Sequence, residues 1–271
     1  MKRSFAIELS VATCALLSLA PLGLLALTAF KSENEVLAVE RLLPQHATLE
    51  NFRRVLGTPE EIPIARWFFN SVFVAGATTL VVVAVSSLAA YALVRLKPRG
   101  STFVLGVIVA TMMVPGQILL VPVYQILNAL GLIDTLIALI FPASSGAFGV
   151  FMLCQFFRDL PVELEEAASL DGCGRWGIFR HVILPNSRPA LATLAIFTFV
   201  GSWNNFMAPL VFLDSLRHFT LPVGLALFQS SYAAEFGLTF AASLLTTLPV
   251  LVAFLLFQRH IIQSVTLSGI K

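Results

Sequence analysis

The stretch Glu163–Pro189 reads ELEEAASLDGCGRWGIFRHVILPNSRP, and it is the most densely charged segment of an otherwise apolar chain. An apolar run flanks it on each side, and each run is long enough to cross a bilayer, which takes about 20 helical residues. Because charged side chains are costly inside hydrocarbon, this stretch should lie at a membrane surface and connect two membrane-spanning helices.

The first half of the stretch predicts a short helix with small residues on one face. Pro161 suits a first helical position, where its missing N–H costs nothing. Glutamates near the helix start interact favourably with the positive end of the helix dipole: Glu163, Glu165 and Glu166. Four residues at helical spacing share a face: Leu164, Ala167, Ala168 and Asp171. The two alanines on this face would let a partner surface approach closely.

The second half predicts a sharp turn and another short helix. Gly172 and Gly174 should end the first helix, because glycine adopts positive φ without strain. The second helix would extend over about residues 175–182, and Pro185 and Pro189 would end it and set the angle into the next span. Two short helices at a sharp angle make a rigid projection.

Several residues of the stretch fall at fixed intervals: Glu166, Ala167, Ala168, Asp171, Gly172, Phe179, Leu184, Pro185 and Pro189. This ordered set resembles the cytoplasmic "EAA loop" of permease subunits of bacterial binding-protein-dependent ABC importers. The alternative is an amphipathic loop that lies on lipid headgroups.

The resemblance implies a division of labour between subunits. A separate ATPase dimer would close on ATP, and the helix Glu163–Asp171 would dock in its surface cleft and transmit closure to the spans. Glu166 would pair with a basic residue of the ATPase, a charge-assisted contact. Ala167, Ala168 and Gly172 would permit close approach, and Phe179 would pack the second helix against the first.

Composition places the whole chain in a membrane. Of its 271 residues, 58% are hydrophobic and 12% are charged, against about 25% charged in soluble domains. The mean hydropathy is +0.89. We therefore predict an all-α integral membrane protein, one permease domain over residues 1–271, with the fold of type I ABC importer permeases that the resemblance implies. Six spans are expected at about residues 8–30, 67–94, 102–124, 135–157, 190–213 and 238–257.

Basic residues orient these spans. The apolar N-terminal run could be a signal peptide, but no small-x-small cleavage site follows it, which favours an uncleaved first span. The short basic turn Arg95–Arg99 marks the cytoplasmic side. Both termini and the loop 158–189 are then cytoplasmic, in the plasma membrane of a bacterium or archaeon. The connections at 31–66, 128–134 and 214–237 are expected outside.

Polar residues within the spans are candidates for a substrate pathway. Proline and glycine at membrane depth are tolerated where a cavity or a neighbouring helix satisfies the freed carbonyls, but they can equally be packing kinks. Adjacent asparagines near mid-span must face protein or water, so they either line the pathway or bond between helices. The candidates are Gln117, Ser144, Ser145, Asn204 and Asn205.

Further segments are similar to permeases of the carbohydrate-uptake class, in particular to the smaller subunit of the maltose type. The pattern W-N-x-F-x-x-P-L occupies Trp203–Leu210, and weaker similarities occur at Thr48–Phe52 and Phe219–Leu225. The tail from Gln258 is also similar, but Ser264 replaces a usual glycine and no final glycine follows. Many relatives carry another polar residue at Asn205, which leaves its contact open.

The sequence lacks the motifs of common enzymes. No GxxxxGKS/T, HExxH or GxSxG occurs, and the histidines and cysteines are scattered: His46, His181, His218, His260, Cys14, Cys154 and Cys173. We therefore expect no catalytic residue, no metal site, no nucleic acid and no cofactor held by this chain. ATP and magnesium would be bound by the partner ATPase.

The resemblance implies a hetero-oligomer in the bilayer: an ATP-binding cassette ATPase dimer, a second permease subunit and an extracytoplasmic solute-binding protein. A sugar or oligosaccharide is the expected cargo, and glycerol phosphate or an oligopeptide is the alternative within transport. An ion-coupled secondary transporter would show inverted repeats and intramembrane carboxylates. A membrane enzyme would need a polar cluster at the membrane face, and the loop glutamates suit docking better.

Overall fold

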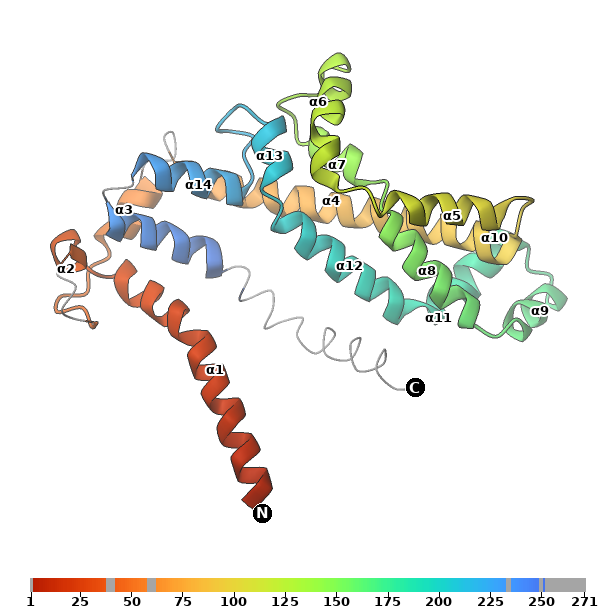
Figure 1. The fold of residues 1–271 in the computed structure, drawn as a ribbon, viewed down its shortest axis with the longest axis horizontal. Helices are drawn as coiled ribbons and strands as arrows, with labels where there is room; N and C mark the ends of the chain where they lie inside the picture. Colours follow the sequence, from red (N-terminus) through yellow and green to blue (C-terminus); the bar gives the residue numbers. More distant parts are fainter. Residues whose placement is uncertain (1, 38–41, 58–61, 233–234, 249–250, 252–271) are drawn as a thin grey trace. The chain divides into compact units, whose positions relative to one another are not determined.

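The computed structural model describes residues 2–37, 42–57, 62–232, 235–248 and 251, and all regular secondary structure in them is helical (Figure 1). This confirms the all-α part of the prediction. The helices in chain order are α1 Lys2–Ala29, α2 Glu33–Leu37, α3 Glu50–Gly57, α4 Ile64–Tyr91, η1 Ala92–Leu96, α5 Ser101–Thr111, η2 Gly116–Leu119, α6 Leu120–Ala129, α7 Ile137–Ala143, α8 Ala147–Asp159, α9 Glu163–Leu170, α10 Arg175–Ile178, η3 Phe179–Ile183, α11 Leu184–Asn186, α12 Arg188–Trp203, α13 Met207–Phe212 and α14 Leu221–Ser231. A further helix occupies Phe236–Leu248.

The chain forms two compact units. Of the described residues, those within Met1–Phe68 and Val223–Leu255 form unit 1, and those within Phe69–Pro222 form unit 2. The single permease domain over residues 1–271 stays a prediction.

Two helices of the described residues are long and apolar enough to cross a membrane on their own, Glu8–Ala29 and Ile64–Leu96. They coincide with the predicted spans at 8–30 and 67–94. Three bent helix pairs raise the total to five if each pair is one span. The helix Phe236–Leu248 covers the first half of the span predicted at 238–257, whereas the rest of that span and the tail 258–271 lie outside the described residues.

The third, fourth and fifth predicted spans are all broken. Helix α5 meets the segment Gly116–Ala129 at 90°, after Pro115 in an extended conformation, and α7 meets α8 at 43°. The first two breaks follow from the proline and glycine residues that the sequence places there. The break after Asn204, between α12 and α13, was not predicted; here Asn205 Oδ1 accepts a hydrogen bond from Ala208 N at 3.3 Å and so satisfies a donor at the start of α13.

The predicted connection at 214–237 is more ordered than expected, because it contains helix α14. In unit 1, Gly224 of α14 packs so tightly against the Trp67 ring that no Cβ could be added there. The sequence of α14 is apolar enough to form a packed helix, although its eleven residues are too few to span a bilayer.

Polar side chains tie the connecting segments of unit 1 together. Asn51 is buried and donates from Nδ2 to the carbonyls of Ala29 at 3.1 Å and Lys31 at 2.8 Å, which satisfies orphan acceptors where α1 ends. The Glu33 carboxylate accepts hydrogen bonds at 2.9 Å from the backbone of Phe236 and of Gly237. It thereby caps the N-terminus of the helix Phe236–Leu248.

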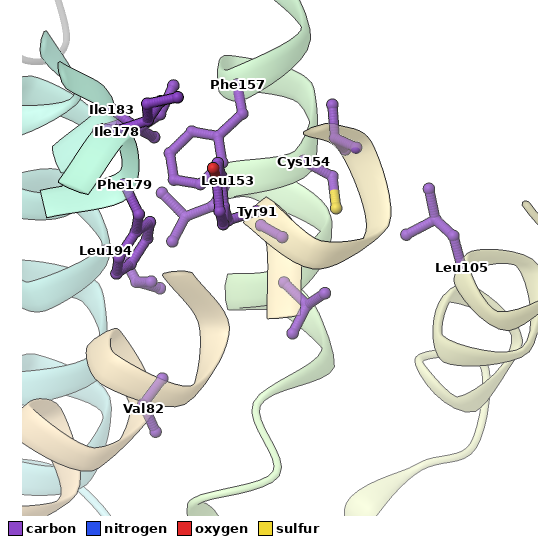
Figure 2. Packing of buried hydrophobic residues seen from close by; sticks show 14 residues of the cluster. Val82, Tyr91, Leu105, Leu153, Cys154, Phe157, Ile178, Phe179, Ile183 and Leu194 are labelled. Carbon is purple, nitrogen blue, oxygen red and sulfur yellow. The ribbon is translucent and has the colours of Figure 1, made fainter. Parts of the chain in front are cut away.

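The core of unit 2 lies where α4, α8, α12 and the segment α10–η3 meet (Figure 2). Helix α8 supplies three fully buried side chains from one face, Leu153, Cys154 and Phe157. Phe179 and Leu194 pack against them from η3 and α12. Within this unit, α9, α10 and α11 lie at one end, and α6, α7 and α13 lie together at the other (Figure 1).

Gly149 of α8 lies in close contact with two neighbouring core helices. A Cβ added there would lie 2.5 Å from Ser86 Oγ of α4 and 3.1 Å from a methyl carbon of Leu194 of α12. We expect Gly149→Ala to destabilise the protein by about 1–3 kcal/mol, since overpacking displaces the neighbouring helices. A thermal melt of the detergent-purified protein measures this. Gly106→Ala in α5 is the control, because open space surrounds Gly106, and an equal loss in both variants would contradict the assignment.

Candidate functional site

Helix α9, Glu163–Leu170, ends in a Schellman motif built on Gly172. The Cys173 N–H donates to Ala168 O at 2.9 Å, and the Gly172 N–H donates to Ser169 O at 3.1 Å. Gly172 has φ +83°, a conformation that only glycine adopts without cost. Gly174 does not take part in this stop: it is extended and precedes α10.

Most of α9 is exposed on unit 2. Glu166, Ala167 and Asp171 are exposed, and Leu170 is 90% exposed, an unusual fraction for a leucine. Ala168 differs from the other residues of its predicted face, because it is half-buried and packs against the core of unit 2. The outward face of α9 therefore combines acidic, small and apolar residues.

An ion pair fixes α9 to the end of α4. Arg95 Nε lies 3.0 Å from Glu165 Oε1, and the two side chains are only 8% and 17% exposed. The alignment of that N–H is poor for a hydrogen bond, so attraction between the charges is the main contribution. Arg95 Nη2 also donates to Leu160 O at 2.6 Å, just after α8. Sequence reasoning missed this pair, because 70 positions separate the partners and nothing local connects them.

Aromatic rings hold the second helix of the loop in place. Phe179 is 3% exposed, and its ring centroid lies 5.0 Å from that of Tyr91 and 5.4 Å from that of Trp176. The Tyr91 hydroxyl donates to Arg175 O at 3.0 Å. Phe179 thus lies in the same core that Ala168 of α9 contacts.

The second helix is longer than predicted. It continues through the π-helical turn η3 and α11 to Asn186, so Pro185 lies inside it and does not end it. The π-helical turn immediately precedes Pro185, where the normal backbone hydrogen bond has no donor. Leu184 is half-buried against the core, and Pro189 lies in the first turn of α12.

A cavity of about 220 Å³ lies between α4, α7, α12 and α13 of unit 2. Two of its lining hydroxyls, on Thr78 and Thr220, have no hydrogen-bond partner among the described residues, although these residues are only 2% and 4% exposed. Asn205 and Ser202 also line it. A buried hydroxyl without a partner costs about 1–3 kcal/mol, so this wall is suited to a polar guest.

Only one of the predicted pathway residues lines this cavity, namely Asn205. Asn204 ends α12, and Gln117 lies in η2 at the 90° bend. Ser144 and Ser145 donate locally, to Phe141 O at 2.6 Å and to Pro142 O at 3.0 Å. Thr78 and Thr220 were not predicted, because a single threonine in an apolar run carries no signal of its own.

Asp134 organises a separate polar cluster in unit 2. Its carboxylate accepts hydrogen bonds from Asp214 N at 3.0 Å and from the Ser215 backbone at 2.9 Å, and it also bonds the Ser215 hydroxyl. His218 Nδ1 lies 3.2 Å away. Partial burial alone would raise the pKa of Asp134, but the hydrogen bonds from Ser215, Asp214 and His218 outweigh it and hold that pKa well below its usual range. The carboxylate therefore stays charged and joins two connecting segments.

The described residues contain no group of three or more His, Cys, Asp or Glu side chains placed to hold a metal ion. Unit 2 instead presents an exposed helix, α9, and a cavity whose mostly apolar wall carries a few hydroxyl groups and one carboxamide.

Residues 82–266 match the sequence family described as "Binding-protein-dependent transport system inner membrane component". The chain belongs to this family. It is therefore a permease subunit of a binding-protein-dependent ABC importer, a multi-pass protein of the inner or plasma membrane, as the motif in the loop 158–189 predicted. Permeases of this family are non-catalytic transport components that bind no cofactor. Membership implies an ATPase, which binds the ATP, and a binding protein as partners.

The similarity to individual relatives covers most of the permease. The permease is 34% identical to the arabinooligosaccharides transport system permease protein AraQ of Halalkalibacterium halodurans, over 99% of this chain and 96% of that protein. It is 35% identical to the trehalose/maltose transport system permease protein MalG of Thermococcus litoralis, over 85% and 84%. A chain from the crystal structure of a bacterial ABC transporter involved in the import of the acidic polysaccharide alginate has the same fold, with a TM-score of 0.83, 22% identity and coverage of 95% and 96%.

The Arg95–Glu165 pair predicts how this permease holds α9. We expect Glu165→Gln to increase amide hydrogen exchange in residues 163–171 by about tenfold or more, because removing one partner of a largely buried ion pair costs about 3–5 kcal/mol. Exchange measured by mass spectrometry on the purified permease reports this directly. Glu166→Gln is the control on the same helix, since Glu166 is exposed, and equal exchange in the two variants would refute a structural role for the pair.

Proposed function

We propose that this permease is one subunit of a heteromeric importer for a sugar or oligosaccharide, and that α9 docks into its ATPase. The observation that carries this proposal is the exposed α9, held to η1 by the Arg95–Glu165 pair and to the core through Ala168. A helix anchored on one side and exposed on the other can transmit displacement of a partner to a membrane span. A loop lying on headgroups would need no such anchor.

In this proposal both termini and the loop 158–189 face the cytoplasm, and six spans form one half of the translocation pathway beside a second, different permease. Basic residues near the loop support this orientation, since cytoplasmic segments are enriched in Lys and Arg. Outside, the solute-binding protein would deliver substrate. The sugar class is supported by the names of the two relatives, which are permeases of an arabinooligosaccharides transport system and of a trehalose/maltose transport system.

The chemistry of the cavity agrees with an uncharged cargo. Its lining includes hydroxyl groups and one carboxamide but no Lys, Arg, Asp or Glu among the described residues. Hydroxyls and amides bind sugars by neutral hydrogen bonds, whereas glycerol phosphate would need cations and an ion-coupled transporter would need carboxylates. This favours a sugar over both alternatives.

Docking through α9 can be tested by ATPase coupling in the complete reconstituted importer. We expect Glu166→Ala to reduce binding-protein-stimulated ATP hydrolysis by about tenfold, since a hydrogen bond to a charged group contributes about 1.5–3 kcal/mol. Gly172→Asp should also reduce it, because a side chain at φ +83° costs about 1–2 kcal/mol and so weakens the end of α9. Glu163→Ala is the matched control in the same helix. Normal binding-protein-stimulated ATP hydrolysis in both Glu166→Ala and Gly172→Asp would contradict the docking proposal.

We further propose that Asn205, with Thr78 and Thr220, contacts the cargo as it passes. Thr78→Val keeps the shape of the side chain but removes the hydroxyl, so we expect the KM for uptake to rise about fivefold, the equivalent of about 1 kcal/mol. Stimulated ATP hydrolysis should be retained. Ser145→Ala is the control, because that hydroxyl is bonded locally and lies outside the cavity. An unchanged KM in Thr78→Val and Asn205→Ala would exclude contact with the cargo.

A further inference from the structure

A second cavity, of about 270 Å³, lies in unit 2 where η1, the start of α5 and the end of α8 come together. Helix α8 contacts both α5 and η1 there. Three cationic side chains line this cavity, Arg95, Lys97 and Arg158, and its apolar wall includes Leu93 and Val162. It is separate from the cavity that contains Asn205, with which it shares no lining residue.

The positive charge of this cavity is not balanced within the described residues. Glu165 neutralises Arg95. Lys97 and Arg158 have no Asp or Glu oxygen within ion-pair distance among the described side chains. Both side chains are exposed, so solvent screens their charges, and an anion that enters the cavity can reach both cations.

The N-terminus of α5 adds donors to the same cavity. This helix has eleven residues and no side-chain cap, because its N-cap is Gly100. Ser101 N bonds Pro98 O and Val104 N bonds Gly100 O, both at 3.0 Å, but the Thr102 N–H has no acceptor in the described part of the chain. The Ser101 and Thr102 side chains also line the cavity. Free N–H groups and hydroxyls at a helix start bind phosphate oxygens.

The backbone at Lys97 is costly. Lys97 has φ 45° and ψ 57°, in the left-handed region, where a residue with a side chain costs about 1–2 kcal/mol and glycine costs almost nothing. The turn therefore sacrifices stability to place a lysine at a position where glycine would fit. This conformational cost is explained if the positive charge of Lys97 contributes to binding a ligand.

We propose that this cavity binds a phosphate group, supplied either by the headgroup of an anionic phospholipid or as free phosphate. Arg158 and Lys97 would neutralise the phosphate, while Thr102 N–H and the hydroxyls of Ser101 and Thr102 would donate to its oxygens. The apolar wall beside them suits the glycerol and acyl end of a lipid. Basic pockets between membrane helices bind anionic headgroups by this combination of charge and apolar contact.

Occupancy of this cavity would bear directly on α9. Arg95 lines the cavity on one side and holds Glu165 on the other. An anion beside Arg95 competes with Glu165 for the same guanidinium, so the bound phosphate and the anchoring of α9 are coupled. The permease would thereby sense the charge of its surroundings at the element proposed for docking.

The experiment compares lipids retained by the intact importer. The complex is reconstituted in nanodiscs of phosphatidylcholine and phosphatidylglycerol, extracted in mild detergent, and its retained lipids are quantified by mass spectrometry. We expect the wild type to be enriched in phosphatidylglycerol, and Lys97→Gln combined with Arg158→Gln to lower that enrichment about tenfold. Arg99→Gln combined with Arg188→Gln removes the same charge outside the cavity and should change it less than twofold.

A second arm identifies the source of the phosphate. Inorganic phosphate is titrated by calorimetry into the delipidated complex, wild type and double variant. If the Lys97/Arg158 variant alone loses phosphatidylglycerol, the lipid headgroup is the ligand. If the wild type shows no phosphatidylglycerol enrichment but binds inorganic phosphate, and the variant does not bind it, free phosphate is the ligand. Equal losses in the control variant, or no binding in either arm, overturn the proposal. Lys97→Gly, which suits the left-handed backbone, repeats the test without risk to folding.

Discussion

The Arg95 guanidinium is the point on which the loop-bearing end of the permease depends. It sits just beyond α4, bonds the carbonyl of Leu160 after α8, and pairs with Glu165 in α9. This one guanidinium thus connects η1, the end of α8 and α9. Apolar packing between these helices would not by itself fix the orientation of a polar loop. Removing either Arg95 or Glu165 leaves the other charge unpaired and largely withdrawn from water, which is strongly destabilising. A projecting helix needs such an anchor if it is to transmit force to the spans.

Local residue chemistry made much of the fold and part of the site predictable. The stop at Gly172, the interruptions after Thr111 and at Ser144–Gly146, and the first two spans follow from helix propensity, chain length and hydropathy, which act within a few residues. The motif in the loop 158–189 was specific enough to identify the family. What the sequence could not supply is pairing at a distance: Glu165 was interpreted through the helix dipole, and its partner Arg95 as a marker of membrane orientation.

The same limit explains the errors in the spans and the cavity. Asn204 and Asn205 were interpreted as polar residues inside one continuous helix, but asparagine also satisfies freed backbone groups, and the helix breaks there. Thr78 and Thr220 are 142 positions apart and meet only because α4 is folded beside the segment before α14. Pro185 is a third case. Proline normally ends a helix, but here a π-helical turn lies before it and the helix continues to Asn186.

The Glu33 cap on the helix Phe236–Leu248 has a consequence for biosynthesis. The two partners are 203 residues apart in the chain, whereas the buried cluster of unit 2 that contacts the loop extends only from Val82 to Leu194. At about 5–20 residues per second, a ribosome needs roughly 10–40 s to pass from one partner to the other. During that interval Glu33 lacks the two backbone N–H groups that it later caps, although the end of α1 can already bond Asn51. The contact between Glu33 and the helix Phe236–Leu248 is therefore among the last of unit 1 to form.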